Sequence, residues 1–131
     1  MAYLKPPFFV RNIGNKLVMR FGGGGAWTLA VAGRTTGALR AVPVIPFEHD
    51  GAQYIVSTRG ESEWVRNLRA AGTVELRRKG ETQTRRATEV PVDQRGPIIA
   101  AYRERAGRSV TTYWKKLPDP ADHPTFRLDP A

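Results

Sequence analysis

The chain has 131 residues, of which 40% are hydrophobic; this is enough for one hydrophobic core and too little for two ordinary domains, so residues 1–131 are expected to form a single domain. Cysteine is absent, which excludes disulfides, thiolate metal sites and cysteine nucleophiles, and with only His49 and His123 we predict no metal site. The 21 basic and 12 acidic residues give a net charge of +9, which favours an anionic partner such as nucleic acid, a membrane surface or a phosphorylated cofactor.

Residues 1–22 predict an amphipathic helix. Pro6 and Pro7 suit its first turn, apolar residues recur mostly at helical spacing, and basic residues occupy the other face. We interpret this helix as a cover on the open side of a barrel; the alternative is peripheral contact with the inner face of the membrane. No stretch is apolar enough to span a membrane and the start lacks the apolar core of a secretory signal, so we expect a cytoplasmic protein.

Residues 26–131 are expected to form the body of the barrel. Apolar runs and alternating apolar residues predict five short strands in hairpins and one closing strand, at residues 26–32, 39–48, 52–58, 73–78, 82–92 and 125–128. Asp50-Gly51 and Lys79-Gly80 supply hairpin turns, the first of which pairs the second and third strands. Pro43 and Pro46 limit the hydrogen-bond donors of the second strand, which indicates an edge, a bulge or a contact with a ligand.

Two more helices are predicted within this body. Residues 61–71 have helical periodicity, with Ser62 as the N-cap and Gly72 as the stop, and a further helix is expected at 93–106. Short strands in hairpins with three helices predict an α+β fold: an antiparallel barrel with covering helices rather than a doubly wound parallel sheet.

The turn between the first two strands has the composition of an anion-binding loop. It reads Gly33-Arg34-Thr35-Thr36-Gly37 and is followed by Arg40. Glycines let backbone amides converge on a phosphate, hydroxyls donate hydrogen bonds, and each guanidinium can engage two oxygens. A polar hairpin turn with solvated arginines explains the same residues, and the sequence leaves both interpretations open.

A second segment, Ser57-Thr58-Arg59-Gly60, ends a strand immediately before the helix at 61–71. Free amides at the start of that helix would let both segments converge on one anionic ligand. Glu61 and Glu63 would repel a phosphate there, which favours a structural or ring-binding use of this corner. Asn67 is placed to reach back to the preceding loop or to lie exposed, and Trp64 to pack in the core or to form a cofactor wall.

Taken together, Gly33 to Arg40, then Pro43, then Ser57 to Gly60, then Trp64-Val65-Arg66-Asn67-Leu68 resemble the deazaflavin-dependent nitroreductase family of actinobacteria. The likeness covers about residues 26–92. It implies a split β-barrel akin to the barrels that bind flavin mononucleotide (FMN), using coenzyme F420 rather than FMN.

The resemblance also implies a site. Arg34, Thr35, Thr36 and Arg40 would hold the phosphate and glutamate tail of the coenzyme, while the segment around Ser57 would lie by the deazaflavin ring. Thr35 and Arg59 stand where lysines are usual. The expected cofactor-binding residues are Arg34, Thr35, Thr36, Gly37, Arg40, Pro43, Val44, Ser57, Thr58, Arg59, Gly60, Trp64 and Asn67.

The activity implied by the resemblance is hydride transfer between F420 and a small conjugated acceptor: a quinone, a nitroaromatic or an enone. This chemistry needs no protein nucleophile, because the cofactor carries the reactive carbon. No catalytic residue is assigned, and Tyr102 and Tyr113 are interpreted as packed or surface residues rather than proton donors. The alternative function is a non-catalytic module of the same fold that holds a coenzyme or an amphipathic anion such as a fatty acid.

The expected partner is a small molecule, and both a monomer and a homodimer are compatible with the sequence. Nucleic acid is not expected, because the basic patch on the predicted hairpin lacks the interleaved aromatic residues that stack on bases. That patch comprises Arg77, Arg78, Lys79, Arg85 and Arg86.

Overall fold

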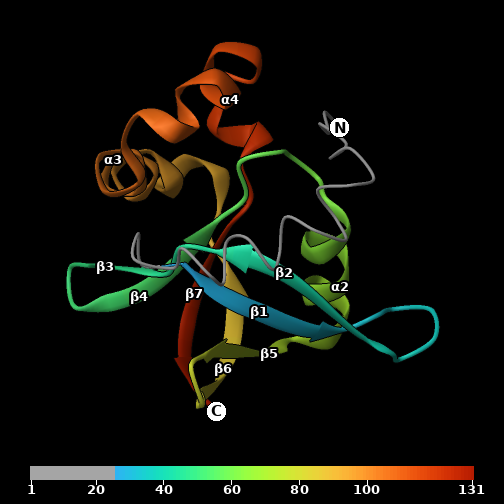
Figure 1. Ribbon diagram of the computed structural model, residues 1–131. Coiled ribbons are helices and arrows are strands. Elements are labelled where there is room, and N and C mark those ends of the chain that lie inside the picture. Colours follow the sequence, from blue (N-terminus) through green and yellow to red (C-terminus); the bar gives the residue numbers. More distant parts are fainter. Residues whose placement is uncertain (1–25) are drawn as a thin grey trace.

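The computed structural model describes residues 26–131, so the helix predicted at 1–22 lies outside the described residues (Figure 1). Seven strands form one antiparallel sheet in the order β2-β1-β5-β6-β7-β4-β3. Their bounds are β1 Trp27–Ala32, β2 Leu39–Val44, β3 Phe47–His49, β4 Ala52–Val56, β5 Thr73–Arg78, β6 Glu81–Glu89 and β7 Thr125–Pro130.

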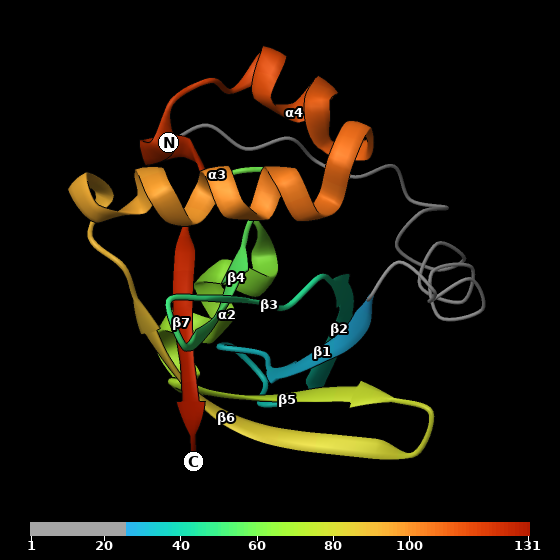
Figure 2. The ribbon, with the colours of Figure 1, turned by 90° about the vertical axis from the view of Figure 1, so that its left-hand side faces the viewer.

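Helices cover the sheet. The α-helices are α2 Glu63–Ala71, α3 Arg95–Ala106 and α4 Thr111–Lys116, and the 3₁₀ turns are η3 Val92–Gln94, η4 Gly107–Val110 and η5 Pro120–Asp122. Figure 2 shows α3 lying across one end of the curled sheet, with α4 on the far side of α3. The predicted α+β class and antiparallel barrel are confirmed, and α4 is an element that the sequence analysis did not predict. None of the helices within residues 26–131 is long and apolar enough to cross a membrane.

Both predicted hairpin turns are confirmed. Asp50-Gly51 and Lys79-Gly80 have positive φ at both positions, as a two-residue turn between twisted strands requires. The predicted end of α2 is also confirmed: Gly72 has a φ of 74° and its N–H donates to the Leu68 carbonyl oxygen at 2.8 Å.

The prediction of one strand at 39–48 is wrong. The segment breaks at Ile45-Pro46 into β2, which pairs with β1, and β3, which pairs with β4. These two strands lie at opposite edges of the sheet, yet only three Cα–Cα steps separate Val44 from Phe47, a span of at most about 11 Å. The sheet must therefore curl until its edges meet at this corner.

Two apolar clusters fill the fold. One lies inside the curled sheet and against α2; its buried residues are Leu29, Val31, Val44, Ile55, Val65, Leu68, Val74, Leu76, Phe126 and Leu128. The other lies between the sheet and the helices α3 and α4; its buried residues are Phe47, Val56, Val90, Ile98, Ile99, Tyr102, Val110 and Trp114. Phe47, the first residue after the break, joins the second cluster and so ties the closure of the barrel to its helical cover.

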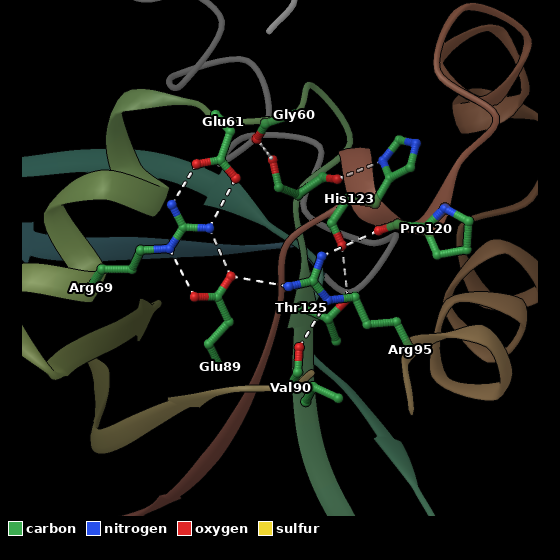
Figure 3. Close-up of polar contacts among 10 residues, drawn as sticks. Gly60, Glu61, Arg69, Glu89, Val90, Arg95, Pro120, His123 and Thr125 are labelled. Carbon is green, nitrogen blue, oxygen red and sulfur yellow. Dashed lines mark hydrogen bonds and ion pairs between the residues drawn. The ribbon is translucent and has the colours of Figure 1, made fainter. Parts of the chain in front are cut away.

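An ionic network, part buried and part exposed, connects α2, β6 and α3 (Figure 3). Arg69 forms two hydrogen bonds with the Glu61 carboxylate and two with Glu89, the latter at 2.7 and 2.8 Å. Arg95 donates to Glu89 at 3.1 Å and to the carbonyl oxygens of Val90 and Pro120 at 2.8 and 3.2 Å. Its guanidinium therefore holds the end of β6 and η5 to the start of α3.

Two members of this network are buried ions. Glu61 is 4% exposed and Arg95 is 5% exposed. The hydrogen bonds from Arg69 hold the pKa of the Glu61 carboxyl below its ordinary value of 4.5, against the opposing effect of burial. Burial lowers the pKa of Arg95, and the two carboxylates raise that of Arg69. Arg69 thus keeps a buried carboxylate ionised.

Replacing Arg69 by methionine is expected to lower the free energy of unfolding at pH 7 by roughly 3 kcal/mol, because Glu61 is left as a buried charge without its partner. In the native protein the stabilisation from Glu61 is present above its ordinary pKa near 4.5 and is lost as the pH falls through the lowered folded pKa. The difference between the two proteins should therefore shrink in acid. Urea unfolding at pH 7 and at a pH below 4.5 measures it.

Arg108→Met removes the same charge at an exposed residue and serves as the control. An Arg69→Met protein that matches the wild type at neutral pH, or whose deficit stays constant in acid, would contradict this account of Glu61.

Candidate functional site

The turn between β1 and β2 is closed by its own hydrogen bonds. The Gly33 N–H donates to the Ala38 carbonyl oxygen at 2.8 Å, and the Gly37 N–H donates to the Gly33 carbonyl oxygen at 2.9 Å. Gly37 has a φ of 79°, and a Cβ built there would meet no atom within 4 Å. Thr35 and Thr36 are exposed on this turn. A fixed backbone thus presents hydroxyls beside open space.

Arg34 and Asn67 join this turn to α2. The Oδ1 atom of Asn67 accepts from the Arg34 backbone N–H at 3.0 Å and from its guanidinium at 2.8 Å. The same guanidinium pairs with Glu63 at 2.8 Å. Asn67 is buried, and it contacts the turn at 33–37 rather than the loop before α2, which differs from both interpretations of the sequence. Since α2 starts just after the segment 57–60, it links the two predicted site segments.

Arg40 lies at the base of the same turn. It is exposed, and its Nε lies 3.6 Å from the position of a Cβ built on Gly33, so its side chain runs along the turn. Within residues 26–131 its guanidinium makes no hydrogen bond or ion pair, whereas that of Arg34 makes both. The two arginines that the sequence analysis treated alike therefore have different surroundings.

The segment 57–60 is held largely by its own residues and by the C-terminal part of the chain. The Ser57 hydroxyl donates to the Gly60 carbonyl oxygen at 2.7 Å, and the Ser57 N–H donates to that of Pro124 at 2.9 Å. His123 is fully buried and stacks on Trp114 with ring centroids 3.9 Å apart. Its Nδ1 lies 2.8 Å from the Ser57 carbonyl oxygen, a contact drawn as a dashed line in Figure 3. These contacts fix the backbone from which the next two side chains project.

Of those two side chains, Arg59 contacts α4. Its Nη2 donates to the Tyr113 hydroxyl at 2.8 Å, and its guanidinium carbon lies 4.9 Å from the centre of the Tyr113 ring. Thr58 is half-buried beside it. Tyr102, by contrast, is 4% exposed and packs between Phe47 and Trp114, and burial raises the pKa of its hydroxyl well above 10. Tyr102 is therefore a packed residue.

An unsatisfied hydroxyl marks the start of α2. Ser62 occupies the N-cap position, as predicted, but its side chain makes no capping hydrogen bond. Its Oγ is buried, and among the residues that the structure describes it is the one buried side-chain N or O atom without a partner. From the sequence, Ser62 was expected only to cap the helix. That its hydroxyl has another possible use, as a binding group, is visible only from the structure, in which the capping hydrogen bond is absent.

The remaining expected site residues lie around the same strand and helix. Val44 is buried in the core, and Pro43 is exposed on the edge strand β2. Trp64 is half-buried and packs on Phe126 with ring centroids 6.1 Å apart. The structure thus gathers Arg34 with Asn67 and Ser57 with Gly60, and directs Arg59 towards α4. It gives the Arg40 guanidinium no hydrogen bond or ion pair among the residues described.

A cavity in the described part of the chain lies apart from these residues. Its volume is about 390 Å³, and none of the expected cofactor-binding residues lines it. The cavity lies at the start of β1, beside β3, β4 and α3. Sequence reasoning missed it because its walls come from four separate segments, and the one available signal was the proline at position 46.

A family model described as F420H(2)-dependent quinone reductase matches residues 7–117. Comparison with curated proteins found no match.

Among solved structures, an F420-H2 dependent reductase is 21% identical, covering 80% of this chain and 94% of its own at a TM-score of 0.60. A chain described as a domain-swapped dimer is 20% identical, covering 92% and 97% at 0.61. The haem storage protein HutZ from Vibrio cholerae is 18% identical, covering 92% and 91% at 0.62. These likenesses show a shared split-barrel fold.

Replacing Asn67 by alanine is expected to lower the free energy of unfolding by about 1–2 kcal/mol, because the Arg34 N–H loses its acceptor in a part-buried site. Urea unfolding measures the loss, and hydrogen exchange should show faster exchange of the Arg34 amide. Arg66→Ala, at the exposed neighbouring position on α2, should change neither quantity. Unaltered exchange at Arg34 in the Asn67 variant would disprove the proposed anchoring of the turn.

Proposed function

Since this chain belongs to the F420H(2)-dependent quinone reductase family, we propose that a quinone is the acceptor of the hydride. Membership makes the chain an F420-dependent reductase with coenzyme F420 as its expected cofactor. It also favours the enzyme over the non-catalytic binding module. The family expected from the sequence was named for nitro reduction, and the matching family is named for quinone reduction, which is why we place the quinone ahead of nitroaromatics and enones.

The residues of the two segments fit a coenzyme with anionic groups at one end and a planar ring at the other. The open space at Gly37, the exposed hydroxyls of Thr35 and Thr36, and the exposed Arg40 suit phosphate and carboxylate oxygens. The buried Ser62 hydroxyl, a hydrogen-bonding group without a partner in the described residues, suits a polar edge of the ring.

We assign these residues different roles. Arg40 would contact the anionic tail directly, and it is the main support for the proposal because it is an exposed cation, without a charged partner in the described part of the chain, beside the hydroxyls of Thr35 and Thr36. Arg34 would act through the turn, whose backbone it fastens to Asn67. Thr58 and Ser62 would lie at the ring end, with Arg59 beside Tyr113.

When bound, F420H2 supplies a hydride, and a quinone that accepts it also takes up one proton and leaves as the quinol. The chain's own residues then need only bind, orient and exclude water. The rigid segment 57–60, held by Ser57 and His123, and the anchored turn at 33–37 provide that fixed framework.

Fluorescence titration of the purified chain should show tighter binding of F420 than of FMN. Arg40→Ala should raise the dissociation constant for F420 at least about tenfold, because a charge-assisted contact is lost. Arg86→Ala removes the same charge from the exposed face of β6 and should change it less than about twofold. Thermal midpoints of both variants should match the wild type.

The acceptor is tested with F420H2 and three oxidants of similar size: menadione, a nitroaromatic and an enone. The highest kcat/KM is expected for menadione. Wild-type affinity in Arg40→Ala would remove the tail assignment, and a preference for the nitroaromatic or the enone would overturn the quinone proposal.

A further inference from the structure

His123 joins two segments of the chain through both nitrogens of its imidazole ring. Nδ1 lies 2.8 Å from the carbonyl oxygen of Ser57, a contact drawn in Figure 3, and Nε2 lies 2.6 Å from the carbonyl oxygen of Leu117. Ser57 begins the segment 57–60, at the proposed ring end of the coenzyme site, and Leu117 directly follows α4. His123 is therefore a fully buried bridge between these two parts of the fold.

Both partners of the ring are backbone carbonyl oxygens, which accept hydrogen bonds and donate none. A neutral imidazole carries one N–H and one lone pair, so it can donate to one of these carbonyls and must turn its lone pair towards the oxygen of the other. An imidazolium has a hydrogen on each nitrogen and can donate to both. The two contacts together therefore fit the charged form of His123 and not the neutral one.

The immediate surroundings of the ring also favour a cation. The ring stacks on Trp114 with ring centroids 3.9 Å apart and an angle of 9° between the planes, and the face of an indole attracts a positive charge. A buried charge must be hydrogen-bonded to be tolerated, and two charge-assisted hydrogen bonds to carbonyl oxygens meet that requirement. No carboxylate takes this part, because in the described part of the chain the histidine that forms an ion pair is His49, with Asp50.

The elements packed against His123 carry other charged side chains of both signs. The guanidinium carbon of Arg103 on α3 lies 5.2 Å from the centre of the Trp114 ring, and Arg95 donates to the Pro120 carbonyl oxygen at 3.2 Å. The complete set is Arg59 on the segment 57–60, Arg95 and Arg103 on α3, Lys115 and Lys116 at the end of α4, and Asp119 and Asp122 at η5. The cations oppose a further positive charge and the aspartates favour it, so the two carbonyl contacts decide which form of the ring is present.

A short series of contacts carries this bridge to the proposed site. Arg59, two residues after Ser57, donates to the Tyr113 hydroxyl on α4 at 2.8 Å, and the Leu117 N–H donates to the Tyr113 carbonyl oxygen at 2.8 Å. The segment 57–60 is thus joined to α4 at its surface through Arg59 and in the interior through His123. A neutral His123 ring would release one of its two carbonyls and so remove the interior link.

We propose that His123 is an imidazolium in the folded protein and that this buried cation is a positioning residue for the ring of the coenzyme. It holds the segment 57–60 against the end of α4 and acts through the backbone of Ser57 rather than by contact with the coenzyme. The proposal rests on the proposed function, since that function places the coenzyme ring at this segment.

The charge is tested in the wild-type chain by nitrogen-15 NMR of the histidine rings at about pH 7. We expect a hydrogen on each ring nitrogen of His123, and slower exchange of these two hydrogens with solvent once F420 is bound, because the bound coenzyme covers the segment that the ring supports. His49, half-buried on β3, is the internal reference, and its ring should not respond to F420. A neutral His123 ring with a single N–H would overturn the proposal.

The positioning role is tested with His123→Gln, which removes the charge and keeps a donor for one carbonyl, and with His49→Gln as the matched control. Binding is measured for two probes: F420, and the deazaflavin riboside that lacks the phosphate and glutamate tail. His123→Gln should raise the dissociation constants for both probes about three- to tenfold, because the disturbance lies at the ring end. Arg40→Ala should weaken binding of F420 alone, and His49→Gln should weaken neither.

A folded His123→Gln protein that binds both probes as tightly as the wild type would remove the positioning role. If circular dichroism shows that this variant does not fold, the wild-type NMR measurement decides, because exchange of the His123 ring hydrogens that is unaltered by F420 removes the role as well. The two proposals fail differently. A wild type that binds no F420 removes both, whereas a wild type that binds F420 with a neutral His123 removes only the present inference.

Discussion

The two-residue connection between β2 and β3 is the constraint on which the rest of the architecture depends. Because Ile45 and Pro46 must join the opposite edges of a seven-stranded sheet, the sheet cannot lie open. Closure at this corner sends Phe47 under α3 and brings the start of β1 beside β3. The cavity, the strand that leads to it and the helical cover all follow from this one short link.

The arginines fall into two groups, those whose side chains bind other parts of the fold and those whose side chains do not. Arg69 and Arg95 are engaged with carboxylates and carbonyl oxygens, and Arg34 is engaged with Asn67 and Glu63, so these side chains maintain the scaffold. Arg40 has no such partner within residues 26–131, which is why it is the proposed contact for the anionic tail of the coenzyme. The net charge of +9 therefore does not show which cations can bind an anion, because an arginine whose N–H groups already donate to the scaffold has fewer left for a ligand.

Much of the fold was predictable, because hairpin turns and the stop at Gly72 depend on local backbone preferences. Pro43 and Pro46 indicated an edge, a bulge or a ligand contact, and β2 and β3 are indeed the two edge strands of the sheet. The break between them was missed because periodicity does not show where a chain leaves one edge and joins the other. The six residues of α4 were missed because a helix this short is stabilised by packing, here that of Trp114 on His123. The contact of Asn67 with Arg34 spans 33 positions and follows only from the tertiary fold.

The position of β7 has a consequence for how the molecule assembles. This strand fills the gap between β6 and β4, so that Phe126 lies opposite Ile55 on one side and Glu89 on the other. Its partners on β4 are separated from it by about seventy residues of intervening chain, and such distant pairings are slow to form. Until residues 125–130 are synthesised, β4 and β6 present unpaired edges to their surroundings, so a nascent or truncated chain is exposed to aggregation that the finished barrel avoids.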